Sequence, residues 1–381
     1  MVRFEFGVFD SFDLGNAGPG QVMTERLEFA AEAERLGLDH YHLAEHHATP
    51  LSVCPSPNLF LSALTQRTSR IRMGALVYVL PAYDPFRLAE EIATLDQLSG
   101  GRLDFGVGRG ISPYELSVLG VPADRAKEIY AESLRAITRA LTTGRMKHDG
   151  VLLRSYDAEL SVRPVQRPYP PLWYPSSNTA SAEWAGHNAI NFIGRWNGGT
   201  FGEAVERYWG AWERAGGNGS GRDGSRSGSG SRDGDGDGDG GSRLNAHVDH
   251  PSVGLATSLV IAPTDAEAER IYLRAHRLYG RRLLKLWHDH DNHDYDRMAD
   301  SALALRSGAA GAGSPETVRD MVVHQVTETG VNYLEVQLFF GDMTLAEALQ
   351  SLRSFAETVM PAVRAAAKPY EAGHPTAPSP H

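Results

Sequence analysis

The chain alternates short runs of β-branched and aromatic residues with longer amphipathic segments. This alternation is typical of a parallel sheet whose strands are joined by helical crossovers, and it argues against a β-sandwich or a helical bundle. In the first unit, residues 4–9 form a predicted strand, and Leu27, Ala30 and Ala31 share one face of a predicted helix that Gly37 ends. The pattern predicts eight strands in all, over residues 4–9, 41–44, 71–80, 102–107, 171–174, 189–193, 254–261 and 332–338.

Eight strands separated by helices match the closed (β/α)₈ or TIM barrel. A doubly wound open sheet is the alternative, because periodicity does not show whether a sheet closes. We expect one barrel domain over residues 1–367 of the 381-residue chain, since barrels with insertions reach this size. Residues 216–243 interrupt it with only Gly, Ser, Asp, Asn and Arg, which offer no apolar surface, so we expect a disordered insertion there. The Pro-rich residues 368–381 are expected to form a flexible tail.

Composition narrows the class of protein. Hydrophobic residues make up 41% and charged residues 22%, the balance of a globular chain with a substantial core. The formal net charge of -10 provides no general basic field for nucleic acid or an anionic membrane. The first residues lack the pattern of a signal peptide, no apolar run approaches the ~20 residues of a membrane span, and the single cysteine, Cys54, allows no intramolecular disulfide. We therefore expect a cytoplasmic protein that acts on a small molecule and binds neither nucleic acid nor membrane.

Two predicted strand ends carry groups that could take part in chemistry, and barrel enzymes place their reacting groups at these ends. His46 and His47 follow the second strand, where histidines can serve as a general acid or base, as metal ligands or as polar lining. Arg109 lies between two glycines after the fourth strand, where it could pair with a phosphate while the glycines let the backbone approach a ligand. Ile111 occupies the third small position of a dinucleotide fingerprint, so a Rossmann nicotinamide site is not predicted.

A third strand end is rich in hydroxyl and amide side chains. Ser176, Ser177, Asn178 and Ser181 lie at the start of the helix predicted over residues 179–186. One such residue would suffice to cap the helix, whereas free backbone N–H groups and the positive end of the helix dipole also bind phosphate.

Together, segments spread over nearly the whole chain resemble the bacterial luciferase-like flavin monooxygenase family. The segments that carry this resemblance are Leu43–His47, Val79–Pro81 with Asp84–Pro85, Leu95–Arg102, Phe105–Gly110, Ser177–Trp184, Gly313–Glu316 and Val359–Pro361.

The resemblance implies a (β/α)₈ barrel that binds reduced FMN, supplied by a separate flavin reductase, and oxidises a small organic substrate with O₂ through a peroxyflavin intermediate. It implies proton transfer by His46 and a phosphate contact by Arg109. Leu76 and Val77 match the pair that presses on the flavin ring, often through a non-proline cis peptide. Further implied features are a phosphate-binding helix start at Ser177, Asn178 and Ser181, a mobile lid over residues 276–306, and a homodimer formed through the helices over residues 58–66 and 86–98.

Three alternatives stay open. The same barrel could use the deazaflavin F420 in a reductase or dehydrogenase, or it could bind flavin without turnover. A metal-dependent hydrolase would need ligands among His40, His42, His46, His47 and the cluster from His288 to His293. No matching set of carboxylate and lysine residues stands at the strand ends, so no metal site is predicted.

Overall fold

The computed structural model describes residues 3–197, 200–217 and 243–367 of the chain. The expected flexible tail over residues 368–381 lies outside the described residues. So does the expected disordered insertion, apart from Gly216, Gly217 and Arg243. The guanidinium of Arg243 donates a hydrogen bond to the carbonyl oxygen of Gly217 at 3.1 Å, so the two described sides of residues 218–242 lie close together.

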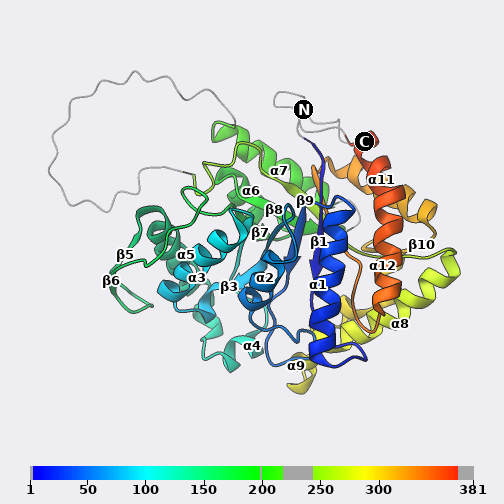
Figure 1. The fold of residues 1–381 in the computed structure, drawn as a ribbon, viewed down its shortest axis with the longest axis horizontal. Helices are drawn as coiled ribbons and strands as arrows, with labels where there is room; N and C mark the ends of the chain where they lie inside the picture. The colour runs from blue at the N-terminus through cyan, green and yellow to red at the C-terminus, as the bar shows by residue number, and fades with distance from the viewer. Residues whose placement is uncertain (1–2, 198–199, 218–242, 368–381) are drawn as a thin grey trace.

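Parallel strands form a closed barrel at the centre of the molecule (Figure 1). In order around the barrel they are β1 (Glu5–Asp10), β2 (His40–Leu43), β3 (Arg72–Val79), β4 (Leu103–Gly108), β7 (Leu172–Pro175), β8 (Asn191–Arg195), β9 (Val253–Ile261) and β11 (Tyr333–Gln337). The ring closes because β8 pairs with β9 and β11 pairs with β1, where Val8 lies opposite Val336. The predicted TIM barrel is confirmed, and the open sheet is wrong.

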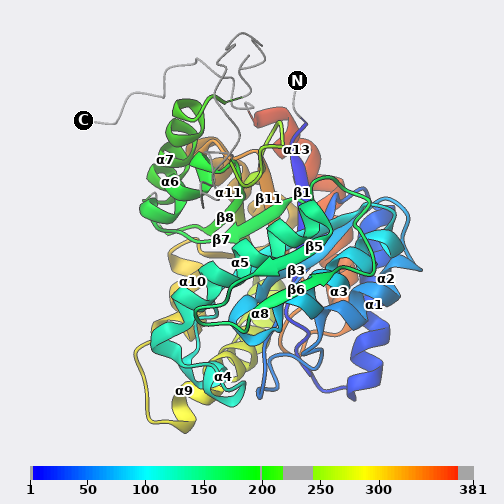
Figure 2. The same ribbon diagram turned by 90° about the vertical axis from the view of Figure 1, so that its left-hand side faces the viewer.

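Helices surround the barrel and bury their apolar faces against the strands (Figures 1 and 2). Local sequence signals set the ends of these helices. At the start of the helix over residues 85–99, the Asp84 carboxylate accepts the N–H of Arg87, and Gly100, at φ 66°, ends the helix. The larger helices are α1 (Pro19–Arg35), α2 (Pro57–Thr65), α3 (Pro85–Ser99), α5 (Ala126–Thr143), α6 (Thr179–His187), α7 (Thr200–Arg214), α8 (Asp265–Leu283), α11 (Pro315–Thr329), α12 (Leu345–Ser354) and α13 (Met360–Ala366).

Several short elements are not evident in the hydrophobic pattern. The hairpin β5 (Arg145–His148) and β6 (Tyr156–Glu159) is largely exposed, so it lacks the alternation of a half-buried strand pair. Strand β10 (Ala310–Gly313) is made only of Ala and Gly, and it pairs with the end of β9. Other short elements are α4 (Pro113–Val118), α9 (Lys285–Asp289), α10 (Ser301–Arg306), η1 (Leu80–Ala82), η2 (Ala123–Arg125), η3 (Asp296–Ala299) and the π-helical turn η4 (Phe355–Val359).

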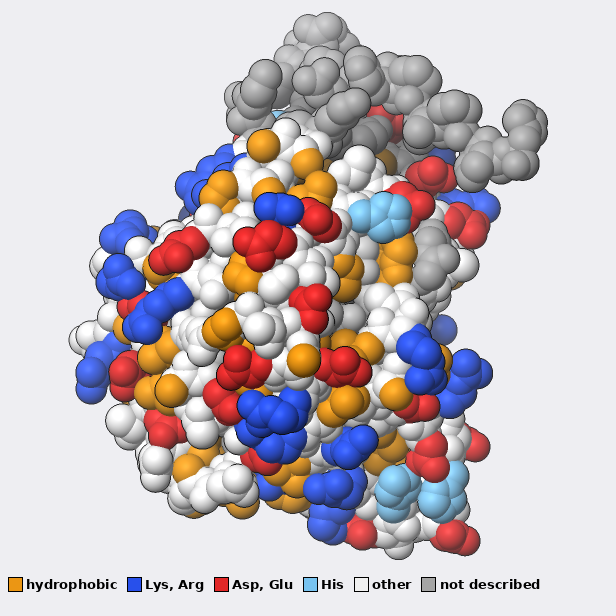
Figure 3. All heavy atoms as spheres, turned by 90° about the vertical axis from the view of Figure 1, so that its right-hand side faces the viewer, with side chains coloured by type: hydrophobic (Ala, Val, Ile, Leu, Met, Phe, Trp, Pro, Cys, Tyr) orange, Lys and Arg blue, Asp and Glu red, His pale blue; other side chains and the backbone are white. Residues whose placement is uncertain are grey.

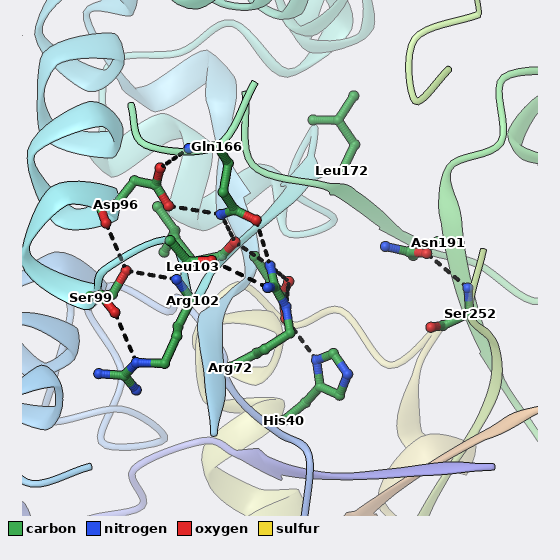
Figure 4. A network of polar contacts seen from close by, with 12 residues as sticks. His40, Arg72, Asp96, Ser99, Arg102, Leu103, Gln166, Leu172, Asn191 and Ser252 are labelled. Atoms are coloured by element: carbon green, nitrogen blue, oxygen red, sulfur yellow. Dashed lines mark hydrogen bonds and ion pairs between the residues drawn. The ribbon is translucent and has the colours of Figure 1, made fainter. Parts of the chain in front are cut away.

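A polar network fastens the end of α3 to the barrel (Figure 4). Asp96 accepts the backbone and side-chain N–H groups of Gln166 at 2.8 and 2.7 Å. Arg102 donates to the carbonyl oxygens of Ser99 and Ile71, both at 2.8 Å. The segment Leu95–Arg102, part of the family resemblance, is therefore structural: its polar groups join α3 to β3 and to the chain that precedes β7.

Charged side chains are buried inside the barrel, near the amino-terminal ends of its strands. Asp104 accepts from Arg72 at 2.8 Å, lies 2.7 Å from the Nδ1 of His40 and lies 3.2 Å from the Nε2 of His42. The other ring nitrogen of His42 lies 2.5 Å from Glu335. These histidines therefore belong to an ionic cluster below the strand ends that carry the candidate site.

The described surface mixes charges of both signs. On the face shown in Figure 3, Lys and Arg side chains are interspersed with Asp and Glu side chains. Within the described residues, none of the helices is both long enough and apolar enough to cross a lipid bilayer.

Candidate active site

A cavity of about 850 Å³ lies at the carboxyl ends of β2, β3, β4 and β7. This is the end of the barrel at which enzymes of this fold carry out their chemistry, and the volume is in the range of small-molecule and cofactor sites. Its walls combine apolar side chains with a few polar groups. The residues of the cavity wall include Glu45, His46, His47, Leu76, Val77, Val79, Arg109, Glu115, Leu116, Leu119, Lys127, Tyr130, Ser176, Asn178, Ala180 and Ser181.

The structure brings together most of the residues that the sequence singled out. The cavity is lined by His46, Leu76, Val77, Arg109, Asn178 and Ser181. Ser177 is the exception: its hydroxyl accepts the backbone N–H of Arg195 at 2.9 Å, and Ser176 lies in the cavity wall instead. Ser177 therefore links β8 to the loop before α6.

The adjacent histidines have separate carboxylate partners. The Nδ1 of His46 lies 3.2 Å from Glu115, while the Nε2 of His47 lies 2.9 Å from Glu45. The hydrogen bond to Glu45 raises the pKa of His47. Glu45 also accepts from the hydroxyl of Tyr83, so it is a buried anchor rather than a free acid. Each histidine therefore keeps one ring nitrogen without a partner among the described residues, the Nε2 of His46 and the Nδ1 of His47.

Glu115 is a site residue that the sequence did not reveal. It lies on the short helix α4, where the Ser112 hydroxyl caps the helix by accepting the N–H of Glu115 at 3.2 Å. Its second carboxylate oxygen accepts the backbone N–H of His47 at 3.1 Å. One carboxylate on α4 therefore fixes both the side chain of His46 and the backbone beside it.

Two cationic side chains and one tyrosine hydroxyl lie at the cavity without an ion pair or hydrogen bond to any described residue. Neither Arg109 nor Lys127 has an ion pair or a hydrogen bond with any described residue, and both side chains are exposed. The hydroxyl of Tyr130 is buried with no hydrogen-bond partner among the described residues, and burial raises its pKa. Lys127 and Tyr130 lie on α5, where helical periodicity does not distinguish them from ordinary surface and core positions. Unpaired positive charge and an unsatisfied hydroxyl fit an anionic, polar ligand.

The start of α6 adds backbone donors to this region. The Asn178 side chain caps the helix by accepting the N–H of Ser181 at 2.7 Å, and the Ser176 hydroxyl accepts from Asn178. The N–H groups of Thr179 and Ala180 have no acceptor among the described residues, and Ala180 lines the cavity. These donors and the helix dipole form a site suited to a phosphate.

The third strand is irregular where it reaches the cavity. The peptide bond between Leu76 and Val77 is cis, as the family resemblance implies, and the pairing of β3 with β4 shifts between Ala75 and Tyr78. A Cβ on Gly106 would collide with the carbonyl oxygen of Ala75, and one on Gly108 would collide with the Val77 side chain. Gly106 and Gly108 therefore make room for β3. Gly108 and Gly110, which flank Arg109, also line the cavity, so the approach of their backbone to a ligand stays a prediction.

The histidines considered for a hydrolase occupy three separate places. His40 and His42 lie in the ionic cluster of the barrel interior, and His46 and His47 lie at the cavity. His288 lies on α9, and His293 lies on the exposed turn that follows it. They do not form one metal centre.

The region expected to form a lid contains α8, α9, η3 and α10, and none of its residues lines the cavity. It reaches the site indirectly, because Tyr114 of α4 stacks on His290 at 4.1 Å between ring centres and packs edge-on against Trp287 at 5.2 Å.

Solved structures share this architecture. Monooxygenase RslO1 from Streptomyces bottropensis superposes with a TM-score of 0.75 at 24% identity, over 94% of this chain and 99% of that one. The oxygenating constituent of a 3,6-diketocamphane monooxygenase from Pseudomonas putida, solved in complex with FMN, has a TM-score of 0.70 at 20% identity, with coverages of 94% and 99%. The F420-dependent tetrahydromethanopterin reductase of Methanopyrus kandleri has a TM-score of 0.63 at 18% identity, again covering 94% and 99%. Proteins of this fold therefore use different cofactors: one of these structures contains FMN, and another is that of an F420-dependent enzyme.

Sequence comparisons identify the family. The uncharacterized protein y4wF of Sinorhizobium fredii is 31% identical over 364 residues, which span 94% of this chain and 97% of that protein. The oxygenase component of the flavin-dependent trigonelline monooxygenase of Acinetobacter baylyi is 33% identical over 173 residues, 45% of this chain and 48% of that protein. Residues 4–333 match the model of the luciferase-like monooxygenases. The chain therefore belongs to the luciferase-like monooxygenase family.

Proposed function

We propose that this protein is the oxygenase component of an FMN-dependent monooxygenase, which takes reduced FMN from a separate flavin reductase and uses O₂ to oxidise a small organic substrate. One observation carries the proposal: a single cavity at the carboxyl ends of the strands holds both an unpaired anion-binding region and a carboxylate-oriented histidine. The first suits a cofactor phosphate, and the second suits proton transfer.

The residues present fit FMN. The phosphate would be held by Arg109, Lys127 and the free N–H groups at the start of α6, since a phosphate dianion needs charged and backbone donors together. The flat flavin ring would pack on the apolar wall made by Leu76 and Val77. The unpartnered Tyr130 hydroxyl would gain a polar partner from the ligand.

The protein's own groups have two tasks. When bound, reduced FMN supplies the electrons that activate O₂. Glu115 accepts from the Nδ1 of His46 and so leaves Nε2 to accept or donate a proton in the cavity. The apolar side chains of Val79, Leu116 and Leu119 limit the access of water to this proton and to the reacting oxygen.

The proposal includes a homodimer formed through α2 and α3. Leu59 on α2 is 74% exposed and Leu98 on α3 is 50% exposed, so both helices present large apolar side chains to solvent. A dimer would bury them. Light scattering at micromolar concentration should give twice the 41.5 kDa of one chain; the mass of a single chain would contradict this part of the proposal.

The decisive experiment is an anaerobic titration of the purified protein with reduced FMN, oxidised FMN and reduced F420. We expect reduced FMN to bind most tightly and the complex to consume O₂ when a flavin reductase and NADH are supplied. Tight binding of F420 alone would favour the reductase or dehydrogenase alternative. Binding of FMN with no reaction in the presence of O₂ and a panel of substrates would favour a flavin-binding protein without turnover.

A further inference from the structure

The exposed turn of residues 288–296, which runs from the end of α9 to the start of η3, carries an unusual density of possible metal ligands. It contains three histidines and four aspartates, with no lysine or arginine. None of its residues lines the cavity at the strand ends.

Three side chains of this turn converge on one point. One oxygen of Asp296 lies 2.6 Å from the Nε2 of His288, and the other lies 3.0 Å from the Nδ1 of His293. The two imidazole rings stack with centres 4.9 Å apart, and one ligand atom from each residue lies within 4.8 Å of the other two. Bonds of about 2.0–2.2 Å to a tetrahedral ion place ligand atoms roughly 3–3.5 Å apart, so small side-chain rotations would complete the site.

A hollow beside the three side chains leaves room for an ion and its waters. His288 and Asp296 line a cavity of about 320 Å³ between α8 and η3, and Asp300 adds a carboxylate to a wall that also contains Arg277 and Arg281. Asp291 is fully exposed and lies 3.7 Å from the Nε2 of His293, beyond hydrogen-bond distance.

We propose that His288, His293 and Asp296 bind one divalent transition-metal ion of the zinc type. Two imidazoles and one carboxylate suit zinc, nickel, cobalt or copper, whereas magnesium and calcium prefer oxygen ligands alone. The proposal does not depend on the flavin chemistry proposed above.

The ion would fasten the region that contacts α4. Trp287 and Tyr295 pack together at 4.3 Å across this turn, and Trp287 and His290 contact Tyr114, the residue before Glu115. A bond from the ion to side chains at both ends of the turn would hold this aromatic cluster in place. Hydrogen exchange of residues 284–296 should then slow on addition of zinc.

The test is calorimetric titration of the untagged full chain with ZnCl₂. We expect one ion per chain, and we expect His293→Ala and Asp296→Asn each to weaken binding by at least ~10–100-fold, the range seen for lost metal-site contacts. His290→Ala is the matched control from the same turn, because its Nδ1 faces the carbonyl oxygen of Leu286 instead of the cluster; it should change the affinity less than about threefold.

Three results would overturn the proposal. The first is an absence of zinc binding to the wild-type chain. The second is unchanged zinc affinity in both His293→Ala and Asp296→Asn. The third is a loss of zinc affinity in His290→Ala as large as the loss in those two variants. Unchanged affinity in the first two variants would place any bound zinc at other histidines. Each variant should keep the circular dichroism spectrum and the thermal unfolding midpoint of the metal-free wild type, which shows that it is folded. Zinc should slow the hydrogen exchange of residues 284–296 in His290→Ala but not in His293→Ala.

Discussion

Arg109 and Lys127 place two positive charges at one cavity, and neither forms an ion pair with a carboxylate of the described residues. Other arginines of this protein do pair with a nearby acid, as Arg319 does with Asp320. An unpaired arginine just after a strand end is free to bind phosphate through two parallel hydrogen bonds. Its contribution can therefore be measured against a ligand that differs only in the phosphate.

Replacement of Arg109 by alanine is expected to weaken FMN binding by about 1.5–3 kcal/mol, the usual contribution of hydrogen bonds to a charged group. Riboflavin lacks the phosphate, so its affinity should not change. Fluorescence titration of both ligands against wild type, Arg109→Ala and the surface control Arg319→Ala would measure this difference. Equal loss of FMN and riboflavin affinity would remove Arg109 from the phosphate site.

His46 and His47 are neighbours in sequence but differ in the partner of each ring. His46→Ala should lower turnover by ~10²–10⁴-fold, the usual contribution of a positioned acid or base, while FMN affinity stays within a few-fold. His47→Ala should lose much less turnover, because the proposal assigns proton transfer to His46 alone. Steady-state rates with matched FMN titrations would separate the outcomes. Unchanged turnover in His46→Ala, or a loss of FMN affinity as large as the loss of rate, would rule out the proton-transfer role.

At the scale of elements, the close packing of β3 against β4 gives Gly106 and Gly108 different roles, the first in stability and the second in ligand binding. A side chain at Gly106 meets the backbone of Ala75, which cannot move without disturbing the barrel, whereas one at Gly108 meets only the side chain of Val77. Gly106→Ala should therefore destabilise the fold by about 1–3 kcal/mol or more. Gly108→Ala should change stability less but weaken FMN binding, because Val77 lines the cavity. Urea denaturation and FMN titration of the two variants check this; equal stability losses would contradict it.

The strands and long helices of this protein were predictable because each buries a regular face. The predicted helix over residues 86–98 and the observed α3 (Pro85–Ser99) differ only at their ends. The exposed hairpin β5–β6 and the short strand β10 could not be predicted in the same way, because neither shows an alternation of apolar and polar residues.

The same limit applies to the candidate site. His46, Arg109 and Asn178 stand at strand ends or a helix start, where local sequence and the family resemblance both single them out. Glu115 and Tyr130 reach the cavity only because loops and helices far apart in sequence fold together; Glu115 lies 69 positions from His46. No local pattern reports a contact of that kind, so these residues required the structure.

At the scale of the whole molecule, the ionic cluster in the barrel interior links five strands, because Glu5 on β1 and Glu335 on β11 join the charged residues of β2, β3 and β4. Asp104 on β4 contacts Arg72 on β3 and both His40 and His42 on β2. Burial alone would raise the pKa of Asp104, but Arg72 and the histidines outweigh it and hold that pKa well below its usual range. Burial likewise disfavours a charged His40, yet Asp104 and Glu5 raise its pKa to about 9. A positively charged His40 is thus part of the folded state at neutral pH.

This cluster predicts a loss of stability in alkaline solution. A histidine titrates near pH 6.5 in the unfolded chain, so the stabilisation from His40 is complete below that pH and disappears as the pH rises through about 9. A shift of that size corresponds to roughly 3 kcal/mol. Urea denaturation at pH 7 and pH 9.5 should therefore show a lower free energy of unfolding at the higher pH. His40→Gln should be less stable at pH 7 and should lose less between the two pH values, whereas the exposed control His324→Gln should follow the wild type. Parallel losses in wild type and His40→Gln would show that the charge of His40 does not stabilise the barrel.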